Sequence, residues 1–406
     1  MKKLVLIFII LLLLVFAACR KETPEAAETE ATEPVALTET GETAPPTSSE
    51  PEEETEFEEE WWMEGSEEDD EEEEEEIVET AVPQVFYSHL TGIQVNRAQQ
   101  RKRPVAIMIN NIRQAQPTVG VSHAEIIYEA IVEGGATRLM MLLSDYETVP
   151  VLGSVRSARE YYVDLMQTHD AIFIHAGGAT SAYAEMNDPA RNIDRLDGVN
   201  PVKGRVFPNT FYRDAERRRT MSVEHTLMAT GRGIVLGLRE ARYRTRHNMD
   251  YTGTFNFNEE ITPLPENNTA NYVSVPYSAH FQPEFIYNPA DKLYYRTQFG
   301  AAHLDGATGE QLRFENVIVI FAEYTDLQTR EGLLACKLTG TGFGFYINGG
   351  KYITIRWRKE TRDSGLYLFN LNGSDLYLNP GKSFISVTST AYNRSVVINS
   401  DLKEIG

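Results

Sequence analysis

The stretch Pro104-Val105-Ala106-Ile107-Met108-Ile109-Asn110-Asn111 decides the first half of the fold. Its apolar residues follow one another without alternation, which predicts a strand buried on both faces. Asn110 and Asn111 end the run, so polar side chains arrive at the carboxyl end of this strand. Similar short apolar runs at 137–143 and 171–175 predict two more buried strands further along the chain.

Helix signals separate these expected strands. Ser122-His123-Ala124-Glu125 and Ser157-Ala158-Arg159-Glu160 both have the spacing of a capping box, which predicts a helix start at each. The sequence predicts helices from the first box through Val132, from the second through Thr168, from Ser181, and over 211–219 and 223–243. Alternating strands and helices predict an α/β fold, a mostly parallel sheet covered by helices.

The character of the chain changes near Tyr251. Short runs rich in aromatic and β-branched residues follow, and turn pairs such as Asn288-Pro289 and Asn348-Gly349 separate them. This pattern is typical of short strands. We therefore expect an α/β domain over 81–250 and a β-rich domain over 251–406.

The first residues predict export. Lys2 and Lys3 precede the apolar run Leu4–Ala18, and Cys19 follows at once. The run has about 15 residues, whereas a spanning helix needs about 20. We interpret 1–19 as a lipoprotein signal peptide whose cysteine is lipidated, for example with palmitate, and anchors the chain at the extracytoplasmic face of the cell membrane. Plain secretion and an uncleaved membrane anchor are the alternatives.

Residues 20–80 hold most of the excess acidity. They contain 27 of the 60 acidic residues, which predicts a disordered acidic tether. The net charge of −22 therefore belongs to this segment, and the rest of the chain is close to neutral. A cationic ligand cannot be inferred from the global charge. Trp61-Trp62-Met63 interrupts the acids, either as a docking motif or by chance.

Several separated motifs resemble those of one known family. They are Arg103–Asn111, Ile127-Tyr128-Glu129, Val132–Leu139, Val155–Arg159 and Gly340-Thr341-Gly342-Phe343-Gly344. In this order they resemble the YerB-like lipoproteins, a family without an assigned activity, over about residues 85 to 395. The resemblance implies a cell-envelope lipoprotein with two conserved regions, but no catalytic mechanism. The family tends to carry His-Asn where this chain has His225-Thr226.

Arginines at the start of the second predicted helix form the main candidate for a binding site. Two guanidinium groups and the free N–H groups of a helix start suit a carboxylate or a phosphate. The candidate ligand-binding set is Arg156, Ser157, Arg159, Arg138, Asn110, Asn111, Asp164, Asp197 and His225. The alternative is an internal salt-bridge hub, in which Arg156 or Arg159 pairs with Glu129, Glu133 or Asp164.

Three residues are candidates for acid–base chemistry. Glu129 and Glu133 lie four apart on the predicted helix, and His175 ends a predicted buried strand beside a Gly-Gly turn. A Ser/His/Asp arrangement lacks the Gly-x-Ser-x-Gly elbow, and Ser157 is more simply an N-cap. The histidines and cysteines show no spacing typical of a metal site, and we expect no cofactor.

The sequence leaves three hypotheses for function open. The first is a non-enzymatic envelope lipoprotein that binds a cell-wall component or a wall-synthesis protein. The second is a hydrolase or transferase on a glycan or lipid-linked anionic wall substrate. The third is a solute-binding lipoprotein with a ligand between its two regions. Nucleic acid is not an expected partner, because an exported protein meets little of it.

Overall fold

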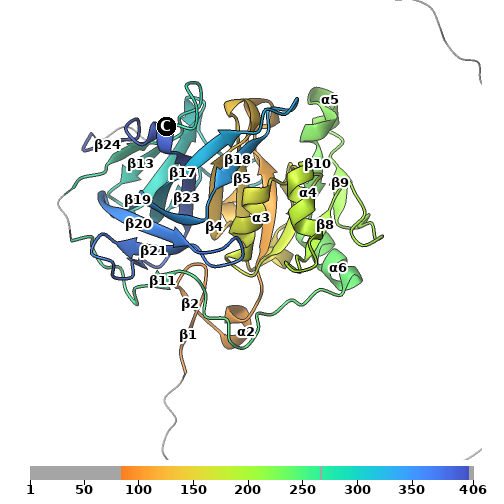
Figure 1. Ribbon diagram of the computed structural model, residues 1–406, viewed down its shortest axis with the longest axis horizontal. Coiled ribbons are helices and arrows are strands. Elements are labelled where there is room, and N and C mark those ends of the chain that lie inside the picture. The colour runs from red at the N-terminus through yellow and green to blue at the C-terminus, as the bar shows by residue number, and fades with distance from the viewer. Residues whose placement is uncertain (1–83, 266–267, 402–406) are drawn as a thin grey trace, which may run out of the picture. The chain divides into compact units, whose positions relative to one another are not determined.

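The computed structural model describes residues 84–265 and 268–401, and Figure 1 shows how their helices and strands are arranged. The predicted signal peptide, its Cys19 and the acidic tether lie outside the described residues, and so does Trp61-Trp62-Met63. Their roles therefore stay predictions from sequence. Among the described residues, no helix combines the length and the apolar character needed to cross a membrane.

One large sheet of eleven strands organises the described chain. Its order is β21-β20-β19-β17-β23-β4-β5-β3-β7-β8, and β18 pairs with β17 beside this path. The strands are β3 (Val105–Asn110), β4 (Ile126–Ile131), β5 (Thr137–Leu143), β7 (Ile172–His175), β8 (Arg195–Asp197), β17 (Asn316–Asp326), β18 (Leu334–Lys337), β19 (Gly340–Asn348), β20 (Lys351–Lys359), β21 (Tyr367–Asn370) and β23 (Ser383–Ser389).

Strands from both halves of the sequence pair within this sheet. β23 lies between β17 and β4 and runs parallel to both, so that Ser383 is the register partner of Ile126. β3, β7 and β8 are also parallel neighbours, whereas β5 is antiparallel to β3 and to β4. The sheet is therefore mixed, and the carboxyl ends of β3, β4, β7 and β8 lie at one edge together with the first residue of β5.

Each face of the sheet carries its own hydrophobic core. On one face, α3 (Glu160–Gln167) and α4 (Thr180–Asn187) pack over side chains such as Met108, Tyr128 and Phe173, and Figure 1 views the sheet from this side. On the other face, Ile107, Val319 and Phe384 pack against a second sheet. That sheet has the order β15-β14-β13-β12-β24, and β16 pairs with β14.

The remaining elements are short. The second sheet consists of β12 (Tyr272–Ser274), β13 (Glu284–Asn288), β14 (Leu293–Gln298), β15 (Ala301–Ala302), β16 (Arg313–Phe314) and β24 (Val397–Asn399). The smaller pairings involve β1 (Phe86–Tyr87), β2 (Gln94–Val95), β6 (Leu152–Gly153), β9 (Phe211–Arg213), β10 (Leu227–Ala229), β11 (Asn256–Phe257) and β22 (Tyr377–Leu378). The other helices are α2 (Arg97–Gln100), α5 (Arg217–Thr220) and α6 (Gly231–Ala241).

The expectation of an α/β first half with a mostly parallel, helix-covered sheet is wrong. The described residues contain five short α-helices, and strands dominate both halves. The segment after Ser122 is the clearest error, because it forms β4 instead of a helix. The capping-box spacing predicted a helix start there, but Ser122 and His123 belong to a single 3-10 turn, and Glu129 of β4 is fully buried and paired. The second capping box is also wrong, since α3 begins at Glu160 with Arg159 as an N-cap whose side chain does not cap.

Candidate anion-binding site

The segment 153–159 crosses the sheet edge at which β3, β7 and β8 end. Its backbone is held from both sides: Arg156 N donates to Met108 O at 2.9 Å, and Ala176 N donates to Arg156 O at 3.0 Å. Ala158 pairs with Gly178 in a single bridge. The segment is therefore fixed between β3 and β7 and presents its arginines at this edge, where sheets with parallel strands often bind ligands.

Two arginines at this edge, Arg159 and Arg138, lie close to one carboxylate, that of Glu133. Arg159 makes a fork with Glu133: its Nε bonds to Oε1, and its Nη2 donates to Oε2 at 2.7 Å. Arg138, the second residue of β5, lies 3.7 Å from the same Oε2 and donates through Nη1 to the carbonyl of Ser157 at 2.8 Å. The predicted alternative of an internal salt bridge is thus correct for Arg159 with Glu133, which leaves Arg156 to be considered.

The pKa values at this edge reflect crowded positive charge. Burial and the neighbouring charge of Arg159 lower the pKa of Arg138 to about 10. Burial raises the pKa of Glu133, but the hydrogen bonds and charge of Arg159 and the charge of Arg138 together hold it below its ordinary value. Glu133 is therefore an anion with two cationic neighbours, and it cannot neutralise both of them.

Arg156 lies beside this pair and is partly buried. Among the described residues its guanidinium has no hydrogen-bond or ion-pair partner. Burial lowers the pKa of Arg156, and the charges of Arg159 and Arg213 lower it further, while those of Glu224 and Glu133 act in the opposite direction. The edge therefore has more guanidinium groups than carboxylates, and Arg156 keeps its five N–H donors unused.

Asn110 and His225 form a second contact at this edge. The Nδ2 of Asn110 lies 2.9 Å from Nδ1 of His225. Burial lowers the pKa of His225, and the charge of Arg156 acts in the same direction, so the neutral ring is favoured. Thr226, which stands where the resembling family tends to have Asn, is fully buried and donates to the carbonyl of Val223 at 2.8 Å. In this chain that side chain closes a turn.

Glu129 and Asn111 belong to a separate, sealed network on the other face of the sheet. Oε1 of Glu129 accepts from Asn111 Nδ2 at 2.7 Å and from Thr137 Oγ1 at 2.6 Å, and Oε2 accepts from Arg296 Nη2 at 2.8 Å. Both charged side chains are 0% exposed. Glu129 and Glu133 are therefore not a carboxylate pair on one helix face, and a substrate has no access to Glu129.

The sequence analysis missed the partners of Glu129. Arg296 Nη1 bonds to Gln298 Oε1 at 2.8 Å and contacts Nδ1 of His303, whose Nε2 lies 2.8 Å from Thr118 Oγ1. Burial and the charge of Arg296 lower the pKa of His303 well below its ordinary value. One signal was present in the sequence. Arg296 follows the aromatic residues of β14, and it lies two residues after Tyr294, so both side chains point to the same, buried face of the strand.

His175 and Asp197 end adjacent strands but do not form a catalytic pair. His175 is fully buried, its Nδ1 lies 2.8 Å from the carbonyl of Gly177, and its distance to Asp197 Oδ1 is 4.0 Å. Burial lowers the pKa of His175. Asp197 accepts from the backbone N–H groups of Gly177 and Val199, both at 2.9 Å. These contacts stabilise the turn after β8.

Asp164 lies apart from the arginines of the edge. It sits on α3 and forms ion pairs with Arg191 at 3.0 Å and with Arg362 at 3.1 Å. Its buried position still raises its pKa.

Within residues 84–265 and 268–401, no three His, Cys, Asp or Glu side chains are grouped so that they could hold a metal ion. The predicted ligand-binding set thus divides, and the part that gathers at the edge is Arg138, Arg156, Ser157, Arg159, Asn110 and His225.

Comparison with known proteins identifies the family of this chain. The chain belongs to the DUF3048 family of proteins of unknown function. The model of the N-terminal domain of this family matches residues 90–244, and the model of its C-terminal domain matches residues 273–385. The two conserved regions expected from the resemblance are confirmed by these matches.

The chain is similar to YerB of Bacillus subtilis (strain 168), a protein whose name includes the word lipoprotein. The identity is 25% over 301 residues, which cover 73% of this chain and 85% of YerB. A crystal structure of YerB covers 77% of this chain and 99% of its own, with a TM-score of 0.65 and 24% sequence identity. This structural likeness supports the fold, and the resemblance to the YerB-like lipoproteins is confirmed.

Proposed function

We propose that this protein is a non-enzymatic envelope lipoprotein that binds an anionic group of a cell-wall component or a wall-synthesis protein. The observation that carries the proposal is the guanidinium of Arg156, which has no partner among the described residues and lies beside Arg138 and Arg159. A carboxylate or phosphate placed there gains charge-assisted hydrogen bonds from groups that the fold already holds in position.

The geometry favours binding over turnover. Two of the three candidate acid–base residues, Glu129 and His175, are fully buried. The third, Glu133, is an anion forked by Arg159, and its lowered pKa makes it a weak base near neutral pH. These features support recognition of an anion by the edge rather than proton transfer to or from a substrate.

Arg156 offers a clean test, because its side chain makes no hydrogen bond that the fold needs. The full chain, purified in a mild detergent, is sedimented with isolated bacterial cell walls. We expect Arg156→Ala to weaken the association roughly 10- to 100-fold, since hydrogen bonds to charged groups contribute about 1.5–3 kcal/mol. The matched control is Arg232→Ala, which removes an exposed arginine from α6. Equal association of wild type and Arg156→Ala contradicts the proposal, and so does turnover of wall fragments that is lost in Glu133→Gln.

The membrane anchor is proposed from the sequence and from the name of the relative. Cys19 follows an apolar run and two alanines, and YerB is named as a lipoprotein. We expect cells fed labelled palmitate to incorporate it into the wild-type chain and to place that chain in the membrane fraction facing the exterior. The variant Cys19→Ser should remain unlabelled. Incorporation of label into Cys19→Ser overturns the assignment.

A further inference from the structure

An exposed surface on β19, β20 and β21 has no part in the function proposed above. The motif Gly340–Gly344 forms the first half of β19, which pairs without interruption with β20. Two of its glycines face inward: a Cβ on Gly342 would lie 2.5 Å from the Trp357 ring, and one on Gly344 would lie 2.2 Å from the carbonyl oxygen of Val319. The strand is therefore regular here, and Thr341 and Phe343 are left on the outer face.

On this outer face, aromatic and arginine side chains alternate from strand to strand. Phe343 is the register partner of Arg356, and Arg356 is the partner of Phe369. In the next row, Thr341 is the partner of Arg358. Together these side chains line a groove of about 450 Å³. Phe343 is 55% exposed, which is unusual for a phenylalanine in the middle of a sheet.

The guanidinium groups of both arginines lie over aromatic rings. The guanidinium carbon of Arg356 lies 5.3 Å from the centre of the Phe343 ring, and that of Arg358 lies 4.8 Å from the centre of the Phe369 ring. Stacking uses the face of a guanidinium and leaves its N–H groups, which lie in its plane, free to donate. The described residues provide Arg358 with one carboxylate, that of Glu360 at 3.6 Å, and provide Arg356 with none.

We propose that this groove, the Phe343/Arg356 groove, binds an acidic saccharide chain in which sugar rings carry carboxylate groups. The apolar face of a sugar ring fits against an exposed phenyl ring, while a carboxylate in the plane of a stacked guanidinium accepts two hydrogen bonds. Neighbouring strands are about 4.8 Å apart, so a row across three strands spans roughly two sugar rings.

Charge complementarity favours this occupant over an uncharged one. The groove has two arginines and one exposed carboxylate, that of Glu360, which pairs with Arg358, so a neutral glycan would leave the guanidinium group of Arg356 without an anion. A single-stranded nucleic acid also combines planar rings with charge. The likeness to a protein named as a lipoprotein favours the saccharide, because an envelope protein meets such chains.

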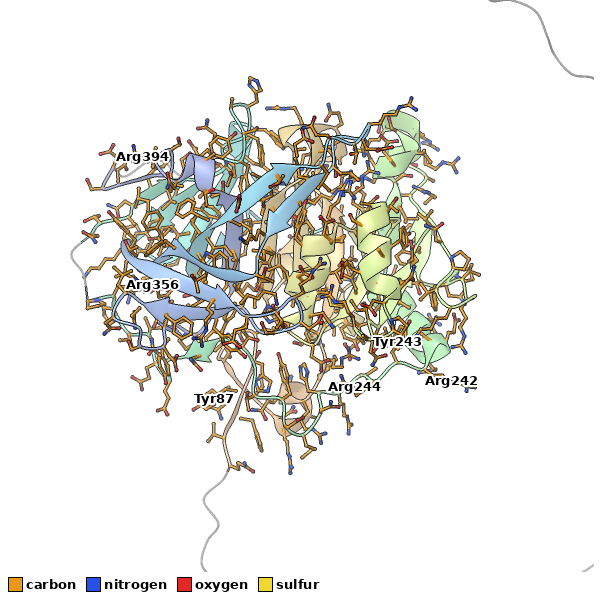
Figure 2. All side chains as sticks on the ribbon, in the orientation of Figure 1. Tyr87, Arg242, Tyr243, Arg244, Arg356 and Arg394 are labelled. Atoms are coloured by element: carbon orange, nitrogen blue, oxygen red, sulfur yellow. The ribbon has the colours of Figure 1, made fainter. Side chains whose placement is uncertain are left out.

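The test measures binding of a galacturonate hexamer to the full chain in detergent by titration calorimetry. We expect Phe343→Ala and Arg356→Ala each to weaken binding about tenfold or more, and Arg356→Lys, which keeps the charge but cannot stack, to weaken it as well. Arg394→Ala is the matched control, an exposed arginine away from the groove lining, and Figure 2 labels both arginines. Circular dichroism confirms that each variant is folded.

The proposal is overturned if the galacturonate hexamer does not bind. It is also overturned if uncharged maltohexaose binds equally well, because the arginines would then have no role. Tighter binding of an oligothymidylate identifies a nucleic-acid surface instead. If Arg156→Ala abolishes hexamer binding while Arg356→Ala does not, the acid occupies the strand-end site, and the groove is refuted while the function proposed above is supported.

Discussion

Replacement of Arg296 by methionine tests the conclusion that Glu129 is structural. Arg296 and Glu129 face each other across the two sheets, both 0% exposed, with 2.8 Å between Nη2 and Oε2. Methionine has a similar reach and no charge, so Arg296→Met leaves the Glu129 carboxylate buried without its counter-ion. The hydrogen bonds that Glu129 accepts from Asn111 and Thr137 remain.

The expected loss of stability is large. Removal of one partner of a buried ion pair costs about 3–5 kcal/mol, because the remaining charge is uncompensated. The total stability of an ordinary domain is about 5–15 kcal/mol, so the variant keeps a folded but weakened structure. For a body of this size the loss corresponds to a fall in Tm of roughly 5–15 °C.

The measurement is thermal unfolding of the full chain followed by circular dichroism. The control is Arg313→Met, since Arg313 and Glu310 are 3.9 Å apart and 44% and 56% exposed. An exposed pair of this kind contributes about 1 kcal/mol at most. The double variant Glu129→Gln with Arg296→Met should lose less than the sum of its two single variants, because the two residues are directly coupled. Equal Tm values for Arg296→Met and Arg313→Met refute the sealed ion pair.

Three further outcomes follow from burial and close packing. Burial and nearby positive charge lower the pKa of His169 to about 3, so the unfolded chain, with an ordinary pKa of about 6.5, binds more protons below that pH. Stability should therefore fall as the pH drops from 6.5 to 5, by roughly 2 kcal/mol for this histidine, and His169→Asn should reduce that loss in urea unfolding at the two pH values. Gly231→Ala should destabilise the chain by about 1–3 kcal/mol although alanine favours helices, because its Cβ would lie 2.0 Å from the carbonyl oxygen of Tyr146; an unchanged urea midpoint argues against this contact. The Cys336 thiol, whose pKa burial raises to about 12, should react with a maleimide only after unfolding, and rapid labelling of the folded chain contradicts its burial.

The strands that were predicted correctly from the sequence are those whose buried residues are apolar and need no charged partner from elsewhere in the chain. The runs at 105–110, 137–143 and 172–175 were recognised because strands buried on both faces show no polar interruption. The run at 126–131 was not, because Glu129 is neutralised by Arg296, which lies 167 residues away in the chain. A partner at that separation leaves no local pattern.

The candidate site was predicted in part for the same reason. Arg156 and Arg159 come from one short segment, so the sequence placed them together at the edge. Their relation to Arg138 and Glu133 depends on how β4, β5 and the segment 153–159 meet, and that is a matter of sheet order. Pairing of β23 with β4 could not be read locally either, since a parallel partner can come from anywhere in the chain.

Titration calorimetry with a defined anion measures whether the arginine-rich edge binds anions. The full chain is titrated with inorganic pyrophosphate and, separately, with succinate, in parallel with Arg156→Ala and the control Arg232→Ala. We expect at least one of the two anions to bind the wild type and the control equally, and to bind Arg156→Ala at least tenfold more weakly. Equal affinity for wild type and Arg156→Ala, or no binding of either anion, contradicts this expectation.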